Sequence, residues 1–328
     1  MKDGMNALRI HGGRIDLAAM LYPDAPRPWL DLSTGINPCA WPTGTVPIVD
    51  LHSLPSPAAI ADLETAAAAV FGTTADRIVA LPGSELGLRT LATLDLPGPV
   101  RFVAPSYATH AEAIDGAVPI SRDAIDTVED GTLLLANPNN PDGHCDTPQR
   151  LLTIGRGGAW LVVDEAFADA TPESSIVPLL RPDDRAIVFR SFGKFFGLPG
   201  VRLGFMIAPP EHVAAMRERL GSWPISAHAV AYGTAAYQDT DWIAAARLSI
   251  VDRAARLDAL LLRHDLRAHG DCGSFRLVET DAAPALFERL AHAGILTRTF
   301  DHAPHWLRMG VPGDDAAFAR LERALGSG

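Results

Sequence analysis

Residues 191–204 read SFGKFFGLPGVRLG and separate two apolar runs, at 186–189 and 205–208. Each run has the length and composition of a buried β-strand and is bounded by turn-forming residues. The pattern predicts a Gly- and Pro-rich loop that places Lys194 between buried strands. Burial in apolar surroundings lowers the pKa of an ammonium group, so the neutral amine becomes available as a Schiff-base nucleophile. By itself, the loop also fits an ordinary lysine at the mouth of a hairpin.

Two further motifs precede this stretch. Residues 137–143 read NPNNPDG, and the two Asn-Pro steps favour a loop of fixed course. Residues 161–167 read LVVDEAF, a buried type of strand that ends in Asp164. A carboxylate buried there is costly unless a cation pairs with it. In this order, and followed by Ser191, Lys194 and Arg202, the motifs resemble the fold-type-I pyridoxal-phosphate (PLP) enzymes related to aspartate aminotransferase.

Within that superfamily the chain is most similar to the threonine-phosphate decarboxylases of cobalamin (vitamin B12) biosynthesis. The resemblance covers essentially the whole chain and rests on three features: HGG at 11–13, LDLSTGINP at 30–38, and Phe167 where aminotransferases usually have a tyrosine. It implies a lyase that decarboxylates L-threonine O-3-phosphate to (R)-1-amino-2-propanol O-2-phosphate.

The resemblance also implies which residues bind the cofactor. Lys194 would carry PLP and then serve as an acid and base, and Asp164 would pair with the protonated pyridine nitrogen, which keeps PLP an electron sink. Asn140 would bond the cofactor oxygen O3′, which has one donor fewer here because of Phe167. Tyr107 would stack on the ring. Glu165 is expected to be structural.

The cofactor phosphate has its own predicted site. Residues 77–85 read as a strand, a Gly-containing turn and the start of a helix, an arrangement whose unpaired amides favour an anion. We therefore expect Gly83, Ser84 and Glu85 to hold the phosphate through their backbone and the serine hydroxyl, together with Ser191 and Arg202. A plain serine cap at the helix start is the alternative.

The substrate is expected to bind residues near both chain ends. The resemblance assigns His11, Gly35, Asn37, Asn140, Arg298 and Arg308. Arg308 would fork onto the carboxylate, which matches its planar donors, and a second arginine suits a dianionic substrate. A strand arginine is otherwise commonly solvent-exposed. Leu54 stands where related enzymes carry a tyrosine that reaches the PLP phosphate of the neighbouring subunit, so that contact is in doubt.

Composition narrows the class of protein. The chain has 328 residues and a net charge of −11, which disfavours nucleic acid and anionic membranes as partners. No apolar run approaches the roughly 20 residues of a membrane helix, and the first residues lack a signal-peptide layout, so a cytoplasmic protein is expected. Three widely spaced cysteines argue against disulfides and a zinc site, and we expect no metal.

The alternation of strands and helices predicts an α/β fold. Residues 46–225 are expected to form a large PLP-binding domain with a mostly parallel sheet covered by helices on both faces. Residues 1–45 and 226–328 are expected to form an N-terminal arm and a small α/β domain. The resemblance implies a homodimer with its sites at the interface.

Two other functions remain open. A histidinol-phosphate aminotransferase shares the cofactor motifs and a phosphorylated substrate, but Phe167, Leu54 and the HGG segment argue against it. A PLP-binding or scaffold protein without turnover is disfavoured by the intact set of cofactor residues.

Overall fold

The computed structural model describes residues 12–46 and 48–326. The chain divides into a large unit, residues 40–140 and 145–246, and a small unit, residues 1–39, 141–144 and 247–328. The units divide at 39/40 and 246/247, whereas the sequence-based boundaries lie at 45/46 and 225/226. Residues 227–238 belong to the large unit because their helix packs closely on it: a Cβ at Gly233 would lie 2.7 Å from Leu63 and 2.5 Å from Leu203.

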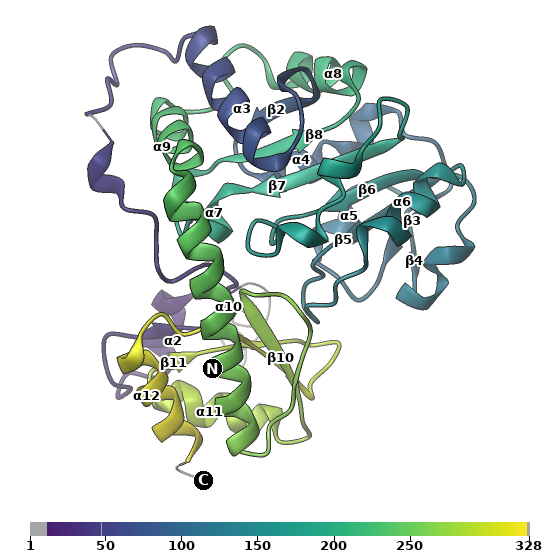
Figure 1. The fold of residues 1–328 in the computed structure, drawn as a ribbon. Helices are drawn as coiled ribbons and strands as arrows, with labels where there is room; N and C mark the ends of the chain where they lie inside the picture. The colour runs from purple at the N-terminus through teal and green to yellow at the C-terminus, as the bar shows by residue number, and fades with distance from the viewer. Residues whose placement is uncertain (1–11, 47, 327–328) are drawn as a thin grey trace. The chain divides into compact units, whose positions relative to one another are not determined.

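A seven-stranded sheet in the order β2-β8-β7-β6-β5-β3-β4 forms the centre of the large unit (Figure 1). The strands are β2 (Ile78–Leu81), β3 (Val100–Val103), β4 (Val118–Ile120), β5 (Thr132–Ala136), β6 (Trp160–Asp164), β7 (Ala186–Ser191) and β8 (Gly204–Ile207). Strands β4, β3, β5, β6 and β7 pair in parallel, and β8 runs antiparallel to β7 and β2. The predicted α/β fold with a mostly parallel sheet is confirmed.

Helices pack on both faces of this sheet, because its central strands are buried on both sides. On one face, Leu88 of α4 (Ser84–Arg89) and Met216 of α8 (Pro210–Leu220) share a core with Phe189. On the other, α3 (Pro57–Phe71) and α9 (Ala227–Gln238) bring Phe71 and Tyr237 against Phe205. The remaining helices of this unit are α5 (Thr109–Glu112), α6 (Pro148–Arg156) and α7 (Phe192–Phe195).

Both chain ends build the small unit. Its antiparallel sheet has the order β12-β13-β10-β9, and β1 pairs in parallel with β11. The strands are β1 (Leu30–Asp31), β9 (Ala268–His269), β10 (Phe275–Glu279), β11 (Ile295–Leu296), β12 (Arg298–Thr299) and β13 (Trp306–Gly310). Ala18 and Leu32 from the N-terminal part share one buried core with Leu290, Leu307 and Phe318.

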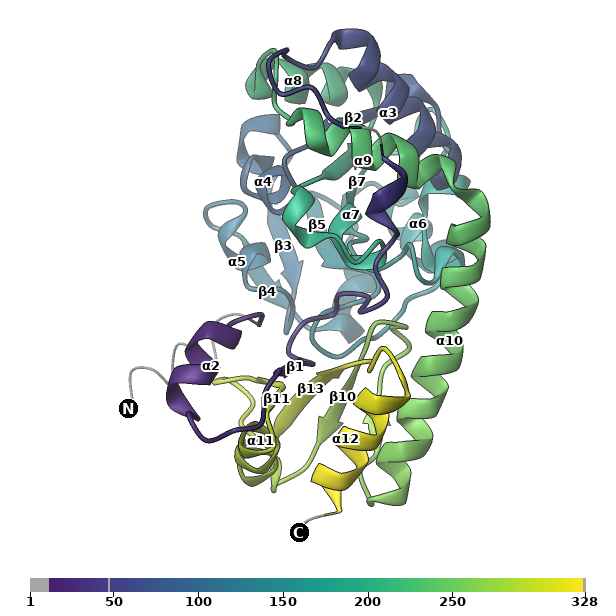
Figure 2. The ribbon, with the colours of Figure 1, turned by 90° about the vertical axis from the view of Figure 1, so that its left-hand side faces the viewer.

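In the part of this unit that the structure describes, the α-helices are α2 (Ile15–Leu21), α10 (Thr240–Arg263), α11 (Ala283–His292) and α12 (Asp315–Leu325). The long α10 starts in the large unit and continues in the small one. There it lies beside α12 (Figure 2), and Arg256 and Arg263 pair with Asp315 and Glu322. Among the described residues, no helix is long and apolar enough to cross a membrane.

Two local predictions need correction. The stretch after β7 is not a plain loop, because Phe192–Phe195 form a helical turn and Pro199–Val201 a 3₁₀ turn. The sequence also predicts a helix from Ser84 to about Leu94, but its α-helical part ends at Arg89. The hydroxyl of Thr90 bonds back to the carbonyl oxygens of Leu86 and Gly87, and a 3₁₀ turn follows.

Candidate active site

Lys194 lies on α7, the helical turn that begins directly after β7. The chain folds back tightly around this turn, since a Cβ at Gly193 would lie only 2.7 Å from the Cα of Pro199. Lys194 is half-buried, and its Nζ lies 5.8 Å from the ring centroid of Phe167. An aromatic face therefore adjoins the amine where aminotransferases usually have a tyrosine.

Asp164 is the buried last residue of β6. Its Oδ1 accepts a hydrogen bond of 3.1 Å from the amide of Ala166, and its Oδ2 lies 3.2 Å from Nε2 of His110. The imidazole is fully buried on α5, and its Nδ1 lies 3.2 Å from Oγ of Ser106. His110 thus orients the carboxylate of Asp164 through its contact with Oδ2. No sequence motif marks His110; the signal that could have pointed to such a residue is the need of a buried acid at a strand end for a partner.

Tyr107 lies in the same region, half-buried and edge-on to His110 at a centroid distance of 6.1 Å. Burial, followed by hydrogen bonding to Glu85, raises the pKa of Tyr107 to about 12, so the hydroxyl stays protonated. Glu85 also accepts hydrogen bonds of 2.9 Å from Thr109 and 2.7 Å from Arg89. Burial raises the pKa of Glu85, but these bonds outweigh it and hold the pKa below its usual value. The carboxylate is thus committed to protein groups.

A cradle of backbone amides adjoins the lysine turn. Ser191 of β7 is opposite Gly204 of β8, which is opposite Leu81 of β2, so the N-terminus of α4 follows at the same sheet edge. The approach is close, since a Cβ at Gly204 would lie 2.4 Å from the nitrogen of Ser84. Gly83 has a φ of +91°, and a Cβ there would lie 2.8 Å from Nη2 of Arg202.

This cradle matches the predicted phosphate site. The first amides of a helix have no intrahelical partners, and the guanidinium of Arg202 adds positive charge. Neither α4 nor α7 has a side-chain cap, so the hydroxyl of Ser191, at the N-cap of α7, is not engaged in capping. The structure brings Gly83, Ser84, Ser191 and Arg202 to one place, and Glu85 is the next residue of α4.

The loop after β5 presents Asn140. Its neighbours are structural: Asn137 donates to the carbonyl oxygens of Asp146 and Ser174, and Asn139 donates to that of Pro105 at 3.1 Å. These bonds fix the course of the loop up to Asn140, which is half-buried. The predicted loop is therefore held by its asparagine side chains as well as its prolines.

These residues of the large unit fit PLP. The cofactor needs an amine, an acid for its pyridine nitrogen and an anion site for its phosphate. Lys194, Asp164 backed by His110, and the cradle around Gly83 and Arg202 provide these groups. The glycines matter to the fit, because a side chain at position 83 or 204 would fill the cradle.

The small unit contains the predicted arginines. Arg298 of β12 and Arg308 of β13 are direct cross-strand partners. Arg308 is buried, donates to the carbonyl oxygen of Ser33 at 2.7 Å and lies over the ring of Phe275. Burial lowers the pKa of Arg298 to about 10, and burial together with the charge of Arg298 lowers the pKa of Arg308 to about 10. Because like charges opposite one another are destabilising, this pair favours a bound anion.

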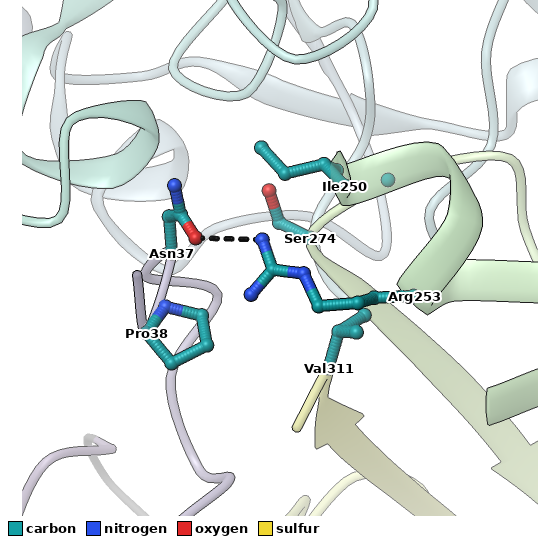
Figure 3. A pocket seen from close by; sticks show the side chains of 7 residues that line it. Asn37, Pro38, Ile250, Arg253, Ser274 and Val311 are labelled. Atoms are coloured by element: carbon teal, nitrogen blue, oxygen red, sulfur yellow. Dashed lines mark hydrogen bonds between the residues drawn. The ribbon is translucent and has the colours of Figure 1, made fainter. Parts of the chain in front are cut away.

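Asn37 lines a small pocket of the same unit with Pro38, Ile250, Arg253, Gly273, Ser274 and Val311 (Figure 3). Its Oδ1 accepts hydrogen bonds from Nη2 of Arg253 at 2.9 Å and from the amide of Cys39 at 3.1 Å. Gly35 is buried two residues earlier. His11 lies outside the described residues.

Fold and site together define a PLP-dependent enzyme of fold type I. Residues 119–325 match the family model described as Aminotransferase class I and II. The chain belongs to this family.

Similar proteins include decarboxylases and aminotransferases. The chain is 41% identical to a threonine-phosphate decarboxylase of Sinorhizobium sp, with 98% of each chain covered, and 38% identical to that of Pseudomonas aeruginosa, with 96% of each covered. It is 31% identical to histidinol-phosphate aminotransferase 2 of Gluconobacter oxydans, covering 84% of this chain and 83% of that one.

Among solved structures, histidinol-phosphate aminotransferase of Sinorhizobium meliloti in complex with pyridoxal-5′-phosphate superposes with a TM-score of 0.80 and 22% identity, covering 94% and 92% of the two chains. L-threonine-O-3-phosphate decarboxylase of Porphyromonas gingivalis gives a TM-score of 0.69 at 18% identity, covering 90% and 98%. These two likenesses concern the fold.

Proposed function

We propose that this protein is a PLP-dependent decarboxylase that converts L-threonine O-3-phosphate to (R)-1-amino-2-propanol O-2-phosphate and CO₂ in cobalamin biosynthesis. The observation that carries the proposal is the identity of 41% and 38% to two threonine-phosphate decarboxylases over nearly the full chain. The histidinol-phosphate aminotransferase from Gluconobacter oxydans is less similar, at 31% over a shorter region.

The large unit would hold the cofactor. When bound, PLP withdraws electrons from the substrate's Cα. The amine of Lys194 would bind the cofactor aldehyde and later return a proton to Cα. Asp164, oriented by His110, would keep the pyridine nitrogen protonated, and the cradle at Gly83, Ser84, Glu85, Ser191 and Arg202 would hold the phosphate.

Three further residues would shape this site. Asn140 would donate to O3′ of the cofactor, and the ring of Tyr107 would cover one face of the pyridine. Phe167 offers no hydroxyl, so it would contribute only its ring beside Lys194. Of Asn140 and Phe167, only Asn140 could then donate a hydrogen bond to O3′.

The small unit would select the substrate. Arg298 and Arg308 are direct partners on adjacent strands, where their like charges repel and burial disfavours both charged forms, so a balancing negative charge is favoured. A substrate with a carboxylate and a phosphate would supply that balance. Asn37, Gly35, Asn140 and His11 complete the proposed substrate contacts. Held by its two anionic groups, the substrate would have its carboxylate oriented to leave as CO₂.

Histidinol-phosphate aminotransferase is the second candidate, and the 31% identity to the Gluconobacter oxydans enzyme favours it. The two activities need different substrates. A decarboxylase acts on L-threonine O-3-phosphate without a keto acid, whereas the aminotransferase requires 2-oxoglutarate and converts the cofactor to its amine form. Incubation of the PLP-loaded protein with each substrate set, with and without 2-oxoglutarate, therefore tests the proposal. The proposal would be contradicted if the protein turned over histidinol phosphate with 2-oxoglutarate and did not act on L-threonine O-3-phosphate.

Assembly and location belong to the same proposal. Ile48 is fully exposed in the single chain, and Leu51 and Leu54 expose 65% and 64% of their surface; several large apolar side chains exposed within one short segment favour an interface. We infer a homodimer that covers this segment. All three cysteines lie within the residues that the structure describes, and none forms a disulfide, which suits the reducing cytoplasm.

A further inference from the structure

A second buried cluster of charges lies next to the proposed cofactor site. Arg190 is 2% exposed, Glu165 is fully buried and Asp169 is 1% exposed. The guanidinium donates through Nη1 to Oε2 of Glu165 at 2.8 Å and through Nη2 to Oδ1 of Asp169. One planar cation is therefore clasped between two carboxylates inside the large unit.

The cluster joins the ends of the two strands that carry the proposed catalytic groups. Glu165 directly follows Asp164 at the end of β6, and Arg190 directly precedes Ser191 in β7. The amide of Glu165 donates to the carbonyl oxygen of Phe189 at 2.9 Å, which extends the ladder between these strands. Because side chains alternate along a strand, Arg190 lies on the opposite face from Ser191.

That opposite face is the one covered by α3. The Cζ of Arg190 lies 4.4 Å from the ring centroid of Phe71, the last residue of α3. Asp164 instead contacts His110 on α5. Arg190 therefore does not share the face on which Asp164 meets its histidine.

The carboxylate of Glu165 organises the chain that follows it. Its Oε2 accepts from Oγ of Ser175 at 2.6 Å, and its Oε1 accepts from the amide of Ile176 at 2.7 Å. Together with the bond from Arg190 to Asp169, these contacts fix the segment 165–176. This segment includes Phe167, whose ring adjoins Lys194.

Stability alone is a weak reason for such a cluster. Burying charges costs desolvation free energy, and apolar residues of similar volume often stabilise a core equally well or better. The planar fork of arginine does, however, fix the angle between two carboxylates, which an apolar cluster or a lysine does not. Catalysis needs such fixed geometry, because a displacement of about 1 Å can cost roughly 100-fold in rate.

We propose that Arg190 is a positioning residue: it clamps the ends of β6 and β7 through Glu165 and Asp169, so that Asp164 and Lys194 keep the separation that PLP requires. This inference rests on the proposed roles of Asp164 and Lys194.

Arg190→Lys tests the inference, because it keeps the charge but removes the fork. We expect a cooperatively unfolding protein whose dissociation constant for PLP rises about tenfold and whose kcat falls about tenfold, with KM changed less than about twofold. The pH midpoint of the absorbance of bound PLP should move by at least about 0.5 unit, because a displaced Asp164 stabilises the pyridine charge less well. A purely structural role would leave this midpoint unchanged.

Arg156→Lys is the matched control. Arg156 donates two hydrogen bonds of 2.8 Å to the carboxylate of Asp184. Asp184 lies just before the first residue of β7, at the end opposite to Arg190. Loss of that fork should leave the PLP midpoint and kcat at their wild-type values. Equal behaviour of the two lysine variants would overturn the inference.

A second variant covers a failure of Arg190→Lys to fold. Glu165→Gln keeps the volume and weakens only one arm of the clasp, so a smaller shift in the same direction is expected, and no shift would overturn the inference. Borohydride reduction of the PLP-loaded wild-type protein, followed by peptide mapping, tests the role of Lys194 separately from that of Arg190. A label away from Lys194 would refute the proposed site itself; a label on Lys194 with unshifted variants would refute only the role of Arg190.

Discussion

His110 and Asp164 are 54 residues apart in the chain and meet inside the large unit. The acid alone would be a costly buried charge, and the imidazole gives it one partner while leaving the carboxylate to pair with a protonated pyridine. The hydrogen bond also fixes the plane of the carboxylate. At the scale of single residues, the proposed chemistry thus depends on a side chain that never needs to touch the substrate.

Replacing His110 should therefore impair the cofactor site. For His110→Phe, which keeps the volume but removes both nitrogens, we expect kcat to fall about 10- to 100-fold, in line with the loss of one hydrogen bond to a charged group. His110→Gln retains a donor and should lose less. Steady-state kinetics with saturating PLP measures both, and equal activity of the phenylalanine variant and wild type would contradict this role.

Local sequence explains why Asp164 could be predicted and His110 could not. An acid at the end of a buried apolar strand is visible within five residues, as is a lysine between two strands. His110 follows Tyr107 in a segment with no marked pattern, and its importance comes only from the pairing of distant strands. The helical turn at Phe192–Phe195 was missed for a similar reason: the glycines and the proline of residues 191–204 indicate a loop, and tertiary contacts decide its form.

The start of α4 depends on a glycine. The φ of +91° at Gly83 is a conformation that other residues rarely adopt, and the guanidinium of Arg202 fills the space where a Cβ would lie. Because Gly83 follows β2 and Arg202 precedes β8, their close approach forms the cradle from the ends of two strands.

Gly83→Ala should weaken PLP binding about tenfold and lower the free energy of unfolding by about 1–3 kcal/mol, the usual cost of a strained backbone conformation. Gly200→Ala is the control, since a Cβ at Gly200 meets nothing within 4 Å. Equilibrium dialysis of PLP and thermal unfolding give the two quantities. If both alanine variants retain PLP equally, the cradle does not hold the phosphate.

The pairing of β12 with β13 brings the two small-unit arginines together. Arg298→Gln should raise the KM for L-threonine O-3-phosphate about tenfold and change kcat less, because it removes one of the two cations proposed to hold the anionic groups. Arg267→Gln, at an exposed position of the same unit, should leave KM unchanged. An unchanged KM for Arg298→Gln would argue against this assignment.

The same pair predicts a pH dependence. Burial holds the pKa of Arg298 and Arg308 at about 10, so both guanidinium groups are charged below that value and lose charge as the pH rises through it. The affinity for the dianionic substrate should therefore fall near pH 10. Measurements of KM across pH 8 to about 10.5 check this expectation.

For the whole molecule, the sequence predicted the α/β class and the parallel sheet because each buried strand is bounded by Gly, Pro or a charged residue. It placed the division between units less well. Helix α9 is rich in alanine and carries no sign of which unit it packs on, and the close contact at Gly233 decides that it belongs to the large unit.

The proposed homodimer gives a prediction at this scale. Leu54→Glu places a charge where the resemblance puts a neighbouring subunit, and it should shift the protein toward monomer in light scattering and weaken PLP retention. Leu262→Glu, on the exposed face of α10 with 63% exposure, should remain dimeric. A dimeric Leu54→Glu protein would exclude position 54 from the interface.

A decarboxylase and an aminotransferase differ in the bond at the substrate's Cα that breaks: the bond to the carboxylate in the first, the bond to the proton in the second. The PLP-loaded protein should release labelled CO₂ from carboxyl-labelled L-threonine O-3-phosphate, without any keto acid and in equal amounts with the phosphorylated amine, and Lys194→Ala should abolish the release. Retention of the label, with turnover only of histidinol phosphate and 2-oxoglutarate, would contradict the decarboxylase and identify an aminotransferase.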